Sequence, residues 1–302
     1  MNTLDRQYNR LLDTVLEYGE VKSDRTGTGT KSIFGYTIRH TMSNGFPLLT
    51  TKKMAVKTMM TELKWFLKGD TNIKYLVNSN CNIWNGDAYK KYKEAIAEVG
   101  LFDNMMSREE FITKIKTDDK FAGKWGELGP IYGTQWRKWK IADGAYTRYV
   151  DQIANLIEQL KTNPDSRRLI VSAWNVSELD QMTLPPCHYG FQCYVSNNKL
   201  SLMWNQRSVD VPLGLPFNIA SYGTLLLLLC EETGYEPGEL IGNLGDCHIY
   251  SNQIEGVREQ ISRDGFNLPT IKLSNVDVLN GEFDYELVDY QSATPIKFPL
   301  SN

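Results

Sequence analysis

The chain has 302 residues, of which 41% are hydrophobic and 11% aromatic, and it carries 33 Lys and Arg against 36 Asp and Glu. This composition supplies apolar material for a substantial core and excludes disordered and collagenous proteins. The formal net charge of -3 gives no global positive field toward nucleic acid or an anionic membrane, so any phosphate binding must be local.

The N-terminal residues 1–19 lack the basic stretch and continuous apolar segment of a signal peptide, and we interpret them as an amphipathic helix. The longest apolar run, 225–230, is far shorter than the roughly 20 residues that span a bilayer. We therefore expect a cytoplasmic protein.

Hydrophobic periodicity predicts the next elements in chain order. Residues 31–39 alternate as a strand, Gly45-Phe46-Pro47 turns the chain, and 56–67 carries the apolar side of a helix. Further helices are predicted over 150–160 and 219–232, and strands over 168–174, 189–195, 200–205, 271–273 and 283–288. The Asn197-Asn198 turn predicts a hairpin between two of these strands.

Residues 90–124 are polar, lysine-rich and helix-prone, and we interpret them as a peripheral insertion without a core of its own. The sequence shows no internal repeat and no Pro/Ser-rich linker. Strands and helices mix without a βαβ rhythm, which favours one α+β domain over residues 1–302.

Two arginine-containing stretches are candidates for binding phosphate. DRTGTGT, 24–30, places Arg25 in a glycine- and hydroxyl-rich loop, but it matches neither common phosphate-loop pattern, and a plain turn explains it as well. SRRLIVSAWN, 166–175, places Arg167 and Arg168 at the start of a strand. Paired guanidinium groups suit a phosphate dianion, and a solvated charge pair fits the same pattern.

A third cluster places polar side chains in apolar surroundings. Within 205–223 these are Gln206, Arg207, Ser208, Asp210 and Asn218. Buried polar groups without partners cost about 1–3 kcal/mol each, and a bound polar ligand would supply the partners. Further along, alternation places His248 and Tyr250 on one face of a short strand.

The five cysteines show no CxxC spacing and the chain no HxxxH spacing, so we expect neither a disulfide framework nor a metal. A buried, inert thiol is the ordinary expectation for each of them. Cys187 differs because LPPCH places it beside His188, and a nearby arginine would lower the pKa of its thiol. No GxSxG elbow supports hydrolase chemistry.

Several stretches, in this order, closely resemble the thymidylate synthase family: DRTGTGT, FPLLTTKK, TELKWFLKGDTNI, NIWN, GELGPIYGTQWR, PDSRRLIVSAWNVSELDQMTLPPCH, QRSVDVPLGLPFNIASY and GDCHIYSN. The resemblance implies an α+β fold whose large mixed or antiparallel sheet is flanked by helices. It implies a homodimer packed sheet against sheet. It also implies transfer of one carbon from 5,10-methylenetetrahydrofolate to C5 of dUMP.

The resemblance assigns roles at the reacting centre. Cys187 would attack C6 of the pyrimidine and make C5 a carbon nucleophile. Glu62 would organise water for proton transfer at O4, and Tyr132 would help remove the C5 proton through water. The other polar residues implied around the pyrimidine are His188, Gln206 and Asp210. The residues implied for the 5′-phosphate are Arg25, Arg207 and Ser208, with Arg167 and Arg168 from the neighbouring subunit; Arg207 would also stabilise the thiolate.

Asn218 would select the base, because its amide can donate to O4 and accept from N3–H of uracil. His248 and Tyr250 would bind the sugar 3′-hydroxyl. The folate side is implied to comprise Lys52 at the glutamate tail, Asp210 at the pterin, and Trp84, Leu213, Gly214 and Phe217.

Four features depart from the family pattern. The chain ends in IKFPLSN, NIWNGDAY lacks a second tryptophan, and Asn205 and Pro212 stand where a tyrosine and a phenylalanine are usual. We interpret these changes as affecting the exclusion of water. If water ended the reaction in place of hydride, the product would be 5-hydroxymethyl-dUMP, as in phage hydroxymethylases that act in the host cytoplasm.

Two other classes are weaker hypotheses. A non-catalytic RNA-binding protein is disfavoured by the net acidity and by the absence of a clustered basic and aromatic surface. A structural or pseudo-enzyme role is disfavoured because every catalytic position that the resemblance aligns is filled.

Overall fold

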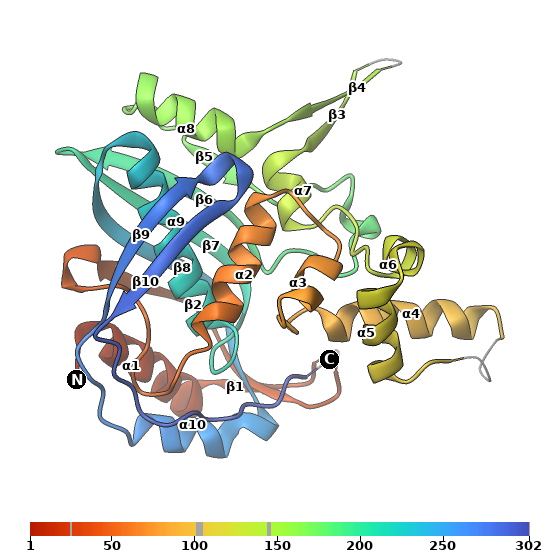
Figure 1. Cartoon of the computed structure of the whole chain (residues 1–302). Helices are drawn as coiled ribbons and strands as arrows, with labels where there is room; N and C mark the ends of the chain where they lie inside the picture. Colours follow the sequence, from red (N-terminus) through yellow and green to blue (C-terminus); the bar gives the residue numbers. More distant parts are fainter. Residues whose placement is uncertain (25, 101–104, 144–145, 302) are drawn as a thin grey trace.

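One six-stranded sheet organises the chain, in the order β1-β2-β8-β7-β6-β5 (Figure 1). The computed structural model describes residues 1–24, 26–100, 105–143 and 146–301. The strands are β1 (Glu20–Lys22), β2 (Thr30–Thr41), β5 (Ile170–Ser172), β6 (His188–Ser196), β7 (Lys199–Asp210) and β8 (Glu236–Tyr250). All neighbours are antiparallel except β7 and β8, which are parallel, and this confirms the large mixed sheet.

Helices pack on the sheet and continue beyond one end of it (Figure 1). They are α1 (Thr3–Tyr18), α2 (Val56–Leu67), α3 (Lys74–Asn78), α4 (Asn85–Glu98), α5 (Arg108–Thr117), α6 (Asp119–Trp125), α7 (Tyr132–Arg137), α8 (Gln152–Thr162), α9 (Leu215–Thr233) and α10 (Ile254–Ile261). Two separate hairpins are formed by β3 (Trp139–Asp143) with β4 (Tyr146–Val150), and by β9 (Thr270–Asp277) with β10 (Glu282–Val288). The predicted α+β class is confirmed.

The β6–β7 hairpin forms where the sequence predicted it. Asn197 and Asn198 have φ angles of 50° and 58°, the left-handed backbone that a tight two-residue turn between strands requires and that asparagine tolerates. Past the turn, side chains alternate between the two faces of β7. Trp204 is buried in the core, whereas Asn205 on the opposite face is partly exposed.

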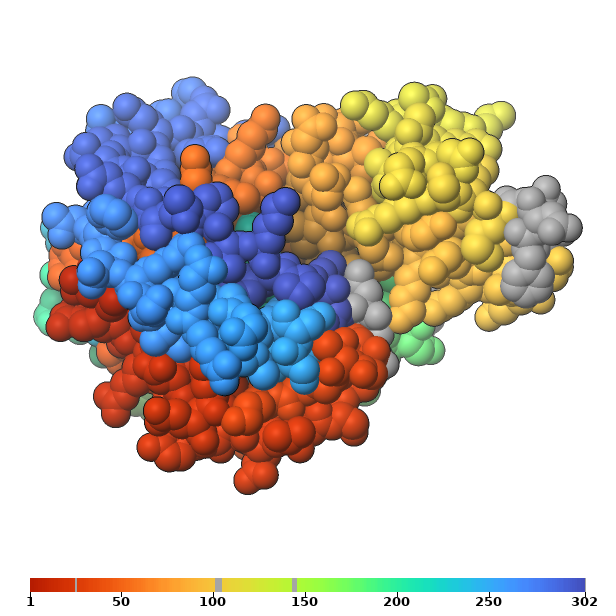
Figure 2. All heavy atoms as spheres, turned by 90° about the horizontal axis from the view of Figure 1, so that it is seen from below, coloured from red at the N-terminus to blue at the C-terminus, as the bar shows by residue number. Residues whose placement is uncertain are grey.

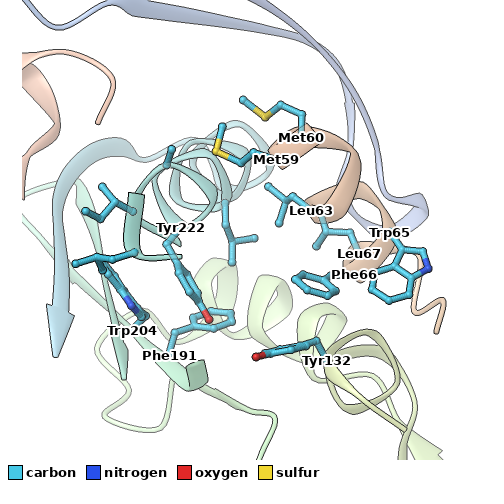
Figure 3. Packing of buried hydrophobic residues seen from close by; sticks show 14 of the residues in the cluster. Met59, Met60, Leu63, Trp65, Phe66, Leu67, Tyr132, Phe191, Trp204 and Tyr222 are labelled. Carbon is cyan, nitrogen blue, oxygen red and sulfur yellow. The ribbon is translucent and has the colours of Figure 1, made fainter. Parts of the chain in front are cut away.

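The core lies between the sheet and the buried helix α9. Tyr222 of α9 stacks almost flat on Trp204 of β7, with ring centroids 5.3 Å apart. On its other side α9 meets the apolar face of α2, where Met60 and Leu63 are buried (Figure 3). Within the described residues, none of the helices combines the length and apolarity that crossing a membrane requires.

The opposite face of the sheet presents apolar side chains to solvent. Ile170 of β5 is 53% exposed and Tyr194 of β6 is 66% exposed. Met203 and Ile241, which are paired in register between β7 and β8, are partly exposed on the same face. Apolar surface of this kind commonly marks an interface.

Three features of the sheet and its connections differ from the prediction. The strand expected over 168–174 covers only Ile170–Ser172. The short strand expected around His248 is the end of β8, which spans 15 residues. Glycines interrupt the apolar alternation of β8, and Gly242 is required because a Cβ there would overlap the indole of Trp204. The sequences of the short helix α7 and of the β3–β4 hairpin show no clear hydrophobic periodicity, so neither element was predicted.

The helices of the stretch over 90–124 enclose an aromatic cluster. Phe111 is fully buried, with ring centroids 5.1 Å from Tyr92 and 5.7 Å from Phe121. Trp125 packs edge-on against Tyr92. These rings belong to the same hydrophobic cluster as the rest of the core of the described residues, so the interpretation of 90–124 as a peripheral insertion stays a prediction.

Gly242→Ala should destabilise the protein by about 1–3 kcal/mol, because the added methyl group overpacks the Trp204 site. Gly123→Ala is the matched control, since a Cβ at Gly123 in α6 meets nothing within 4 Å and alanine is favoured by up to about 1 kcal/mol in a helix. Urea unfolding at one protein concentration measures both. Equal stability of Gly242→Ala and the parent would contradict the close approach of Gly242 to the Trp204 indole.

Candidate active site

Cys187 lies between the pair Pro185-Pro186 and His188, which is the first residue of β6. Its backbone N–H donates to the Tyr132 hydroxyl at 2.7 Å, and its carbonyl oxygen accepts the Arg207 N–H at 2.8 Å. Tyr132 belongs to α7 and Arg207 to β7, so a helix and the sheet hold the backbone of Cys187 from two sides. The thiol is free of any disulfide, and the residue is half-buried.

Burial raises the pKa of the Cys187 thiol, and the positive charge of Arg207 lowers it only in part. The carboxylates of Asp87 and Asp210 act against Arg207 by raising the same pKa. The direction that we expected for Arg207 is correct. In the single chain, however, burial outweighs it, so Arg207 alone does not supply a thiolate.

The Arg207 side chain lies along the loop that carries Cys187. Its Nε and Nη2 atoms donate to the carbonyl oxygens of Pro186 and Pro185, each at 3.0 Å. Its guanidinium carbon lies 5.4 Å from the ring centroid of Trp174. These contacts fix the guanidinium group at the exposed edge of the site, where an anion can reach it.

His188 is held as a neutral imidazole. Its Nδ1 lies 2.8 Å from the Tyr222 hydroxyl, and its ring stacks on Tyr132 with centroids 4.2 Å apart. Burial lowers the pKa of His188 to about 3. Figure 3 shows the hydroxyls of Tyr132 and Tyr222 directed toward the same space between α2 and the sheet.

Glu62 lies on α2 at the wall of this space. Its Oε1 accepts the Trp84 indole N–H at 2.8 Å, and burial raises the pKa of the carboxyl to about 7. A small cavity brings Glu62 together with His188 and Asn218, two of the other predicted site residues. A carboxyl group that titrates near neutral pH can both donate and accept a proton.

Asn218 is oriented by a relay that begins in the core. The Trp204 indole N–H donates to Gln206 Oε1 at 3.1 Å, and Gln206 Nε2 donates to Asn218 Oδ1 at 3.1 Å. Ser208 takes part through its backbone carbonyl, which also accepts from Gln206 Nε2. The relay directs the Asn218 oxygen toward Gln206 and leaves its amide nitrogen on the other side.

Asp210 lies at the end of β7, where the chain turns toward α9. Its carboxylate accepts the Leu213 N–H at 3.0 Å and two contacts from Gln253 Nε2 at 3.3 Å. Burial raises the pKa of Asp210, while the nearby His248 and Lys52 lower it. His248 and Tyr250 share one face of β8 as predicted, with ring centroids 5.2 Å apart.

The residues predicted for the folate side fall into two groups. Trp84 is buried beside Glu62, and Leu213, Gly214 and Phe217 are partly exposed where α9 begins. Lys52 is only 4% exposed, and its ammonium donates to the Pro212 carbonyl oxygen. Burial lowers the pKa of Lys52 to about 7.

Some predicted positions lie apart from this cluster. Arg167 and Arg168 are exposed on the turn that precedes β5. Arg25 lies outside the residues that the structure describes. Asn205 was expected to affect water at the site, and this is wrong, because Asn205 lies on the outer face of β7 and accepts from Asn243 Nδ2 at 3.2 Å.

Asp87 is the residue near the thiol that sequence reasoning missed. It lies in the first turn of α4, within the NIWNGDAY stretch, and its charge raises the pKa of Cys187. The departure from the family pattern at this stretch was the available signal. Across the described parts of the chain, no group of three or more His, Cys, Asp or Glu side chains is placed to hold a metal ion.

The fold and the site together fit a class of enzyme in which a half-buried cysteine lies next to buried polar groups, since His188, the residue after Cys187, lines a small cavity with Glu62 and Asn218. The family model described as Thymidylate synthase matches residues 6–302. The chain is 50% identical over 295 residues to the thymidylate synthase of Mycoplasma mobile, covering 96% of this chain and 98% of the relative. The enzyme of Listeria monocytogenes is 47% identical, with 98% and 99% covered, and that of Phytoplasma mali 48%, with 94% and 96% covered. The chain belongs to the thymidylate synthase family.

Glu62→Gln should change how stability depends on pH. The pKa of Glu62 is raised from 4.5 to about 7 in the fold, so ionisation opposes folding. The parent therefore loses stability as the pH rises through this window, by about 1.4 kcal/mol per unit of pKa shift, and the glutamine variant does not. Urea unfolding should show that the free energy of unfolding of the variant, relative to that of the parent, is larger at a pH above about 7 than at a pH below 4.5. A constant difference would place the Glu62 pKa at its ordinary value.

Proposed function

We propose that the protein converts dUMP to dTMP, with 5,10-methylenetetrahydrofolate as the donor of the carbon and the hydride. The observation that carries the proposal is Cys187, clamped at its backbone and followed by His188, which lines one small cavity with Glu62 and the oriented amide of Asn218 in a chain of this family. The family uses 5,10-methylenetetrahydrofolate as its cosubstrate and binds dUMP.

In this mechanism the Cys187 sulfur adds to C6 of the pyrimidine. The vinylic carbon C5 becomes nucleophilic only while the sulfur is attached, which is the advantage of covalent catalysis. Arg207 favours the thiolate electrostatically, and an arginine brought close by substrate or partner would add to this effect. Tyr132 and Glu62 then serve proton transfer through water, the former to remove the C5 proton and the latter at O4.

The remaining roles follow from chemistry and position. Asn218 selects uracil, since an amide can donate to O4 and accept from N3–H, and His188 stays neutral beside it. Arg207 and Ser208 would hold the phosphate together with Arg25, while His248 and Tyr250 would bind the sugar 3′-hydroxyl.

The folate side fits a flat pterin. Trp84, Leu213 and Phe217 offer apolar surface, Gly214 leaves room at the start of α9, and the Asp210 carboxylate can accept N–H groups. When bound, the folate supplies the carbon and the hydride that complete the methyl group. The relatives named above are thymidylate synthases, and they lend no support to the hydroxymethylase alternative.

Cys187→Ser should reduce turnover by several orders of magnitude, because a serine hydroxyl is rarely ionised at neutral pH. Cys230→Ala, at a buried position on α9, is the control and should retain turnover. Assays with dUMP and 5,10-methylenetetrahydrofolate should yield dTMP and dihydrofolate in equal amounts. Formation of 5-hydroxymethyl-dUMP with tetrahydrofolate would contradict the proposed product.

We also propose that two copies pack sheet against sheet, with Arg167 and Arg168 reaching the phosphate bound by the other copy. The exposed apolar side chains of Ile170 and Tyr194 support this arrangement, since the dimer would cover them. Both arginines are exposed, as a residue that acts in another subunit must be in the single chain.

Subunit mixing tests this arrangement. Cys187→Ser and the double variant Arg167→Glu/Arg168→Glu should each be inactive alone, and mixing them should restore activity. The restored activity would come from mixed dimers, in which one site combines an intact Cys187 with intact arginines from the other copy. Activity that stays absent after verified subunit exchange would show that each chain uses its own arginines.

A further inference from the structure

Phe298, near the C-terminus, is enclosed between α10 and Lys52. The residue is 9% exposed, and a Cβ at Gly256 would come within 2.8 Å of Phe298 Cε1, so the ring lies directly against the helix backbone. Lys52 Nζ lies 4.5 Å from the ring centroid. A desolvated ammonium over an aromatic face is the favourable arrangement for a cation–π interaction.

The same ammonium group is attached to the turn between β7 and α9. Lys52 Nζ donates to the carbonyl oxygen of Pro212, and the neighbouring Asp210 carboxylate favours its charged form. This turn carries Asp210, Leu213 and Gly214, which are residues of the proposed folate side. Lys52 thus connects the aromatic ring of the C-terminal segment to the folate side.

Gln253 makes a second connection to the next residue of the segment. Its side chain is buried, and Nε2 contacts both carboxylate oxygens of Asp210 at 3.3 Å and the Pro299 carbonyl oxygen at 3.2 Å. Pro299 and Leu300 are exposed, so the burial of the segment is strongest at Phe298, and Pro299 is attached only through its carbonyl oxygen. Figure 2 shows the C-terminal segment in dark blue lying across this side of the molecule, next to a hollow.

We propose that Phe298 is a positioning residue that holds the C-terminal segment against the β7–α9 turn, with Lys52 as the cation beneath its ring. Lys52 then serves the segment in addition to the contact with the folate's glutamate tail that the resemblance implies. The inference rests on the proposed function for what the segment closes, namely the folate side, but the attachment itself can be measured without turnover.

Hydrogen–deuterium exchange of the full chain tests the attachment. Phe298→Leu keeps an apolar side chain but removes the aromatic face, and the backbone amides of residues 298, 300 and 301 should exchange up to about 30-fold faster, the equivalent of about 2 kcal/mol. Phe298→Tyr keeps an aromatic ring and should keep the parent's protection from exchange. Phe266→Leu is the matched control, because that ring is 40% exposed, and it should leave protection at 298–301 unchanged. Unchanged exchange in Phe298→Leu would overturn the proposal.

Steady-state kinetics then separate the two roles of Lys52. Lys52→Met keeps an unbranched side chain that is one heavy atom shorter and removes the charge, and methionine suits a buried site. The proposal predicts that Phe298→Leu raises KM for 5,10-methylenetetrahydrofolate by the same factor for cofactor with one glutamate and with several, and that Lys52→Met raises KM for both.

If the rise in Lys52→Met were confined to the cofactor with several glutamates, Lys52 would serve the tail alone, and this would overturn the proposal. The kinetic prediction and the exchange prediction can fail independently of each other. If the parent produced no dTMP, the proposed function would fall, while faster exchange in Phe298→Leu would still establish the attachment.

Discussion

The two backbone hydrogen bonds of Cys187 are the constraint on which the site depends. The Tyr132 hydroxyl accepts from its N–H, and its carbonyl accepts from the Arg207 N–H. Both partners also carry proposed chemistry, so the groups that fix the cysteine are the groups that would act beside it. Displacing α7 from β7 would therefore disturb the nucleophile, the proton transfer and the phosphate contact together. A residue held by hydrogen bonds to both a helix and a strand is placed more exactly than one held by a loop alone.

Burial dominates the electrostatics of this site. It raises the pKa of Cys187 and Glu62 and lowers the pKa of His188, so the described groups favour their neutral forms. A neutral, enclosed pocket suits an uncharged pyrimidine ring, but it disfavours the thiolate that the reaction needs. The proposed arrangement resolves this conflict with positive charge at the edge of the pocket, from Arg207 in the same chain and from Arg167 and Arg168 in the partner. The cost of forming the thiolate would then fall when the complete site assembles around its substrate.

Much of this structure could be predicted from local sequence, and the failures have physical causes. The helix α2 begins and ends where its apolar side predicted, and the Asn197-Asn198 turn forms as expected. Only the end of the strand β8 was predicted, because glycines interrupt its apolar alternation, and one of them, Gly242, serves close packing against Trp204, which no local pattern reveals. The outer position of Asn205 follows from simple alternation with Trp204. The burial of Lys52 beneath Phe298 brings together residues that are far apart in the sequence, and neither a local pattern nor the family resemblance indicates it.

The central claim is that Cys187 adds to C6 of dUMP and that a folate-borne carbon then joins C5. Intact-protein mass spectrometry with 5-fluoro-dUMP and 5,10-methylenetetrahydrofolate tests it most directly, because fluorine at C5 cannot leave as a proton does and the adduct should accumulate. The account predicts a mass increase equal to one nucleotide plus one folate, located on the peptide that contains Cys187. An unchanged mass, or an adduct on another cysteine, would contradict it.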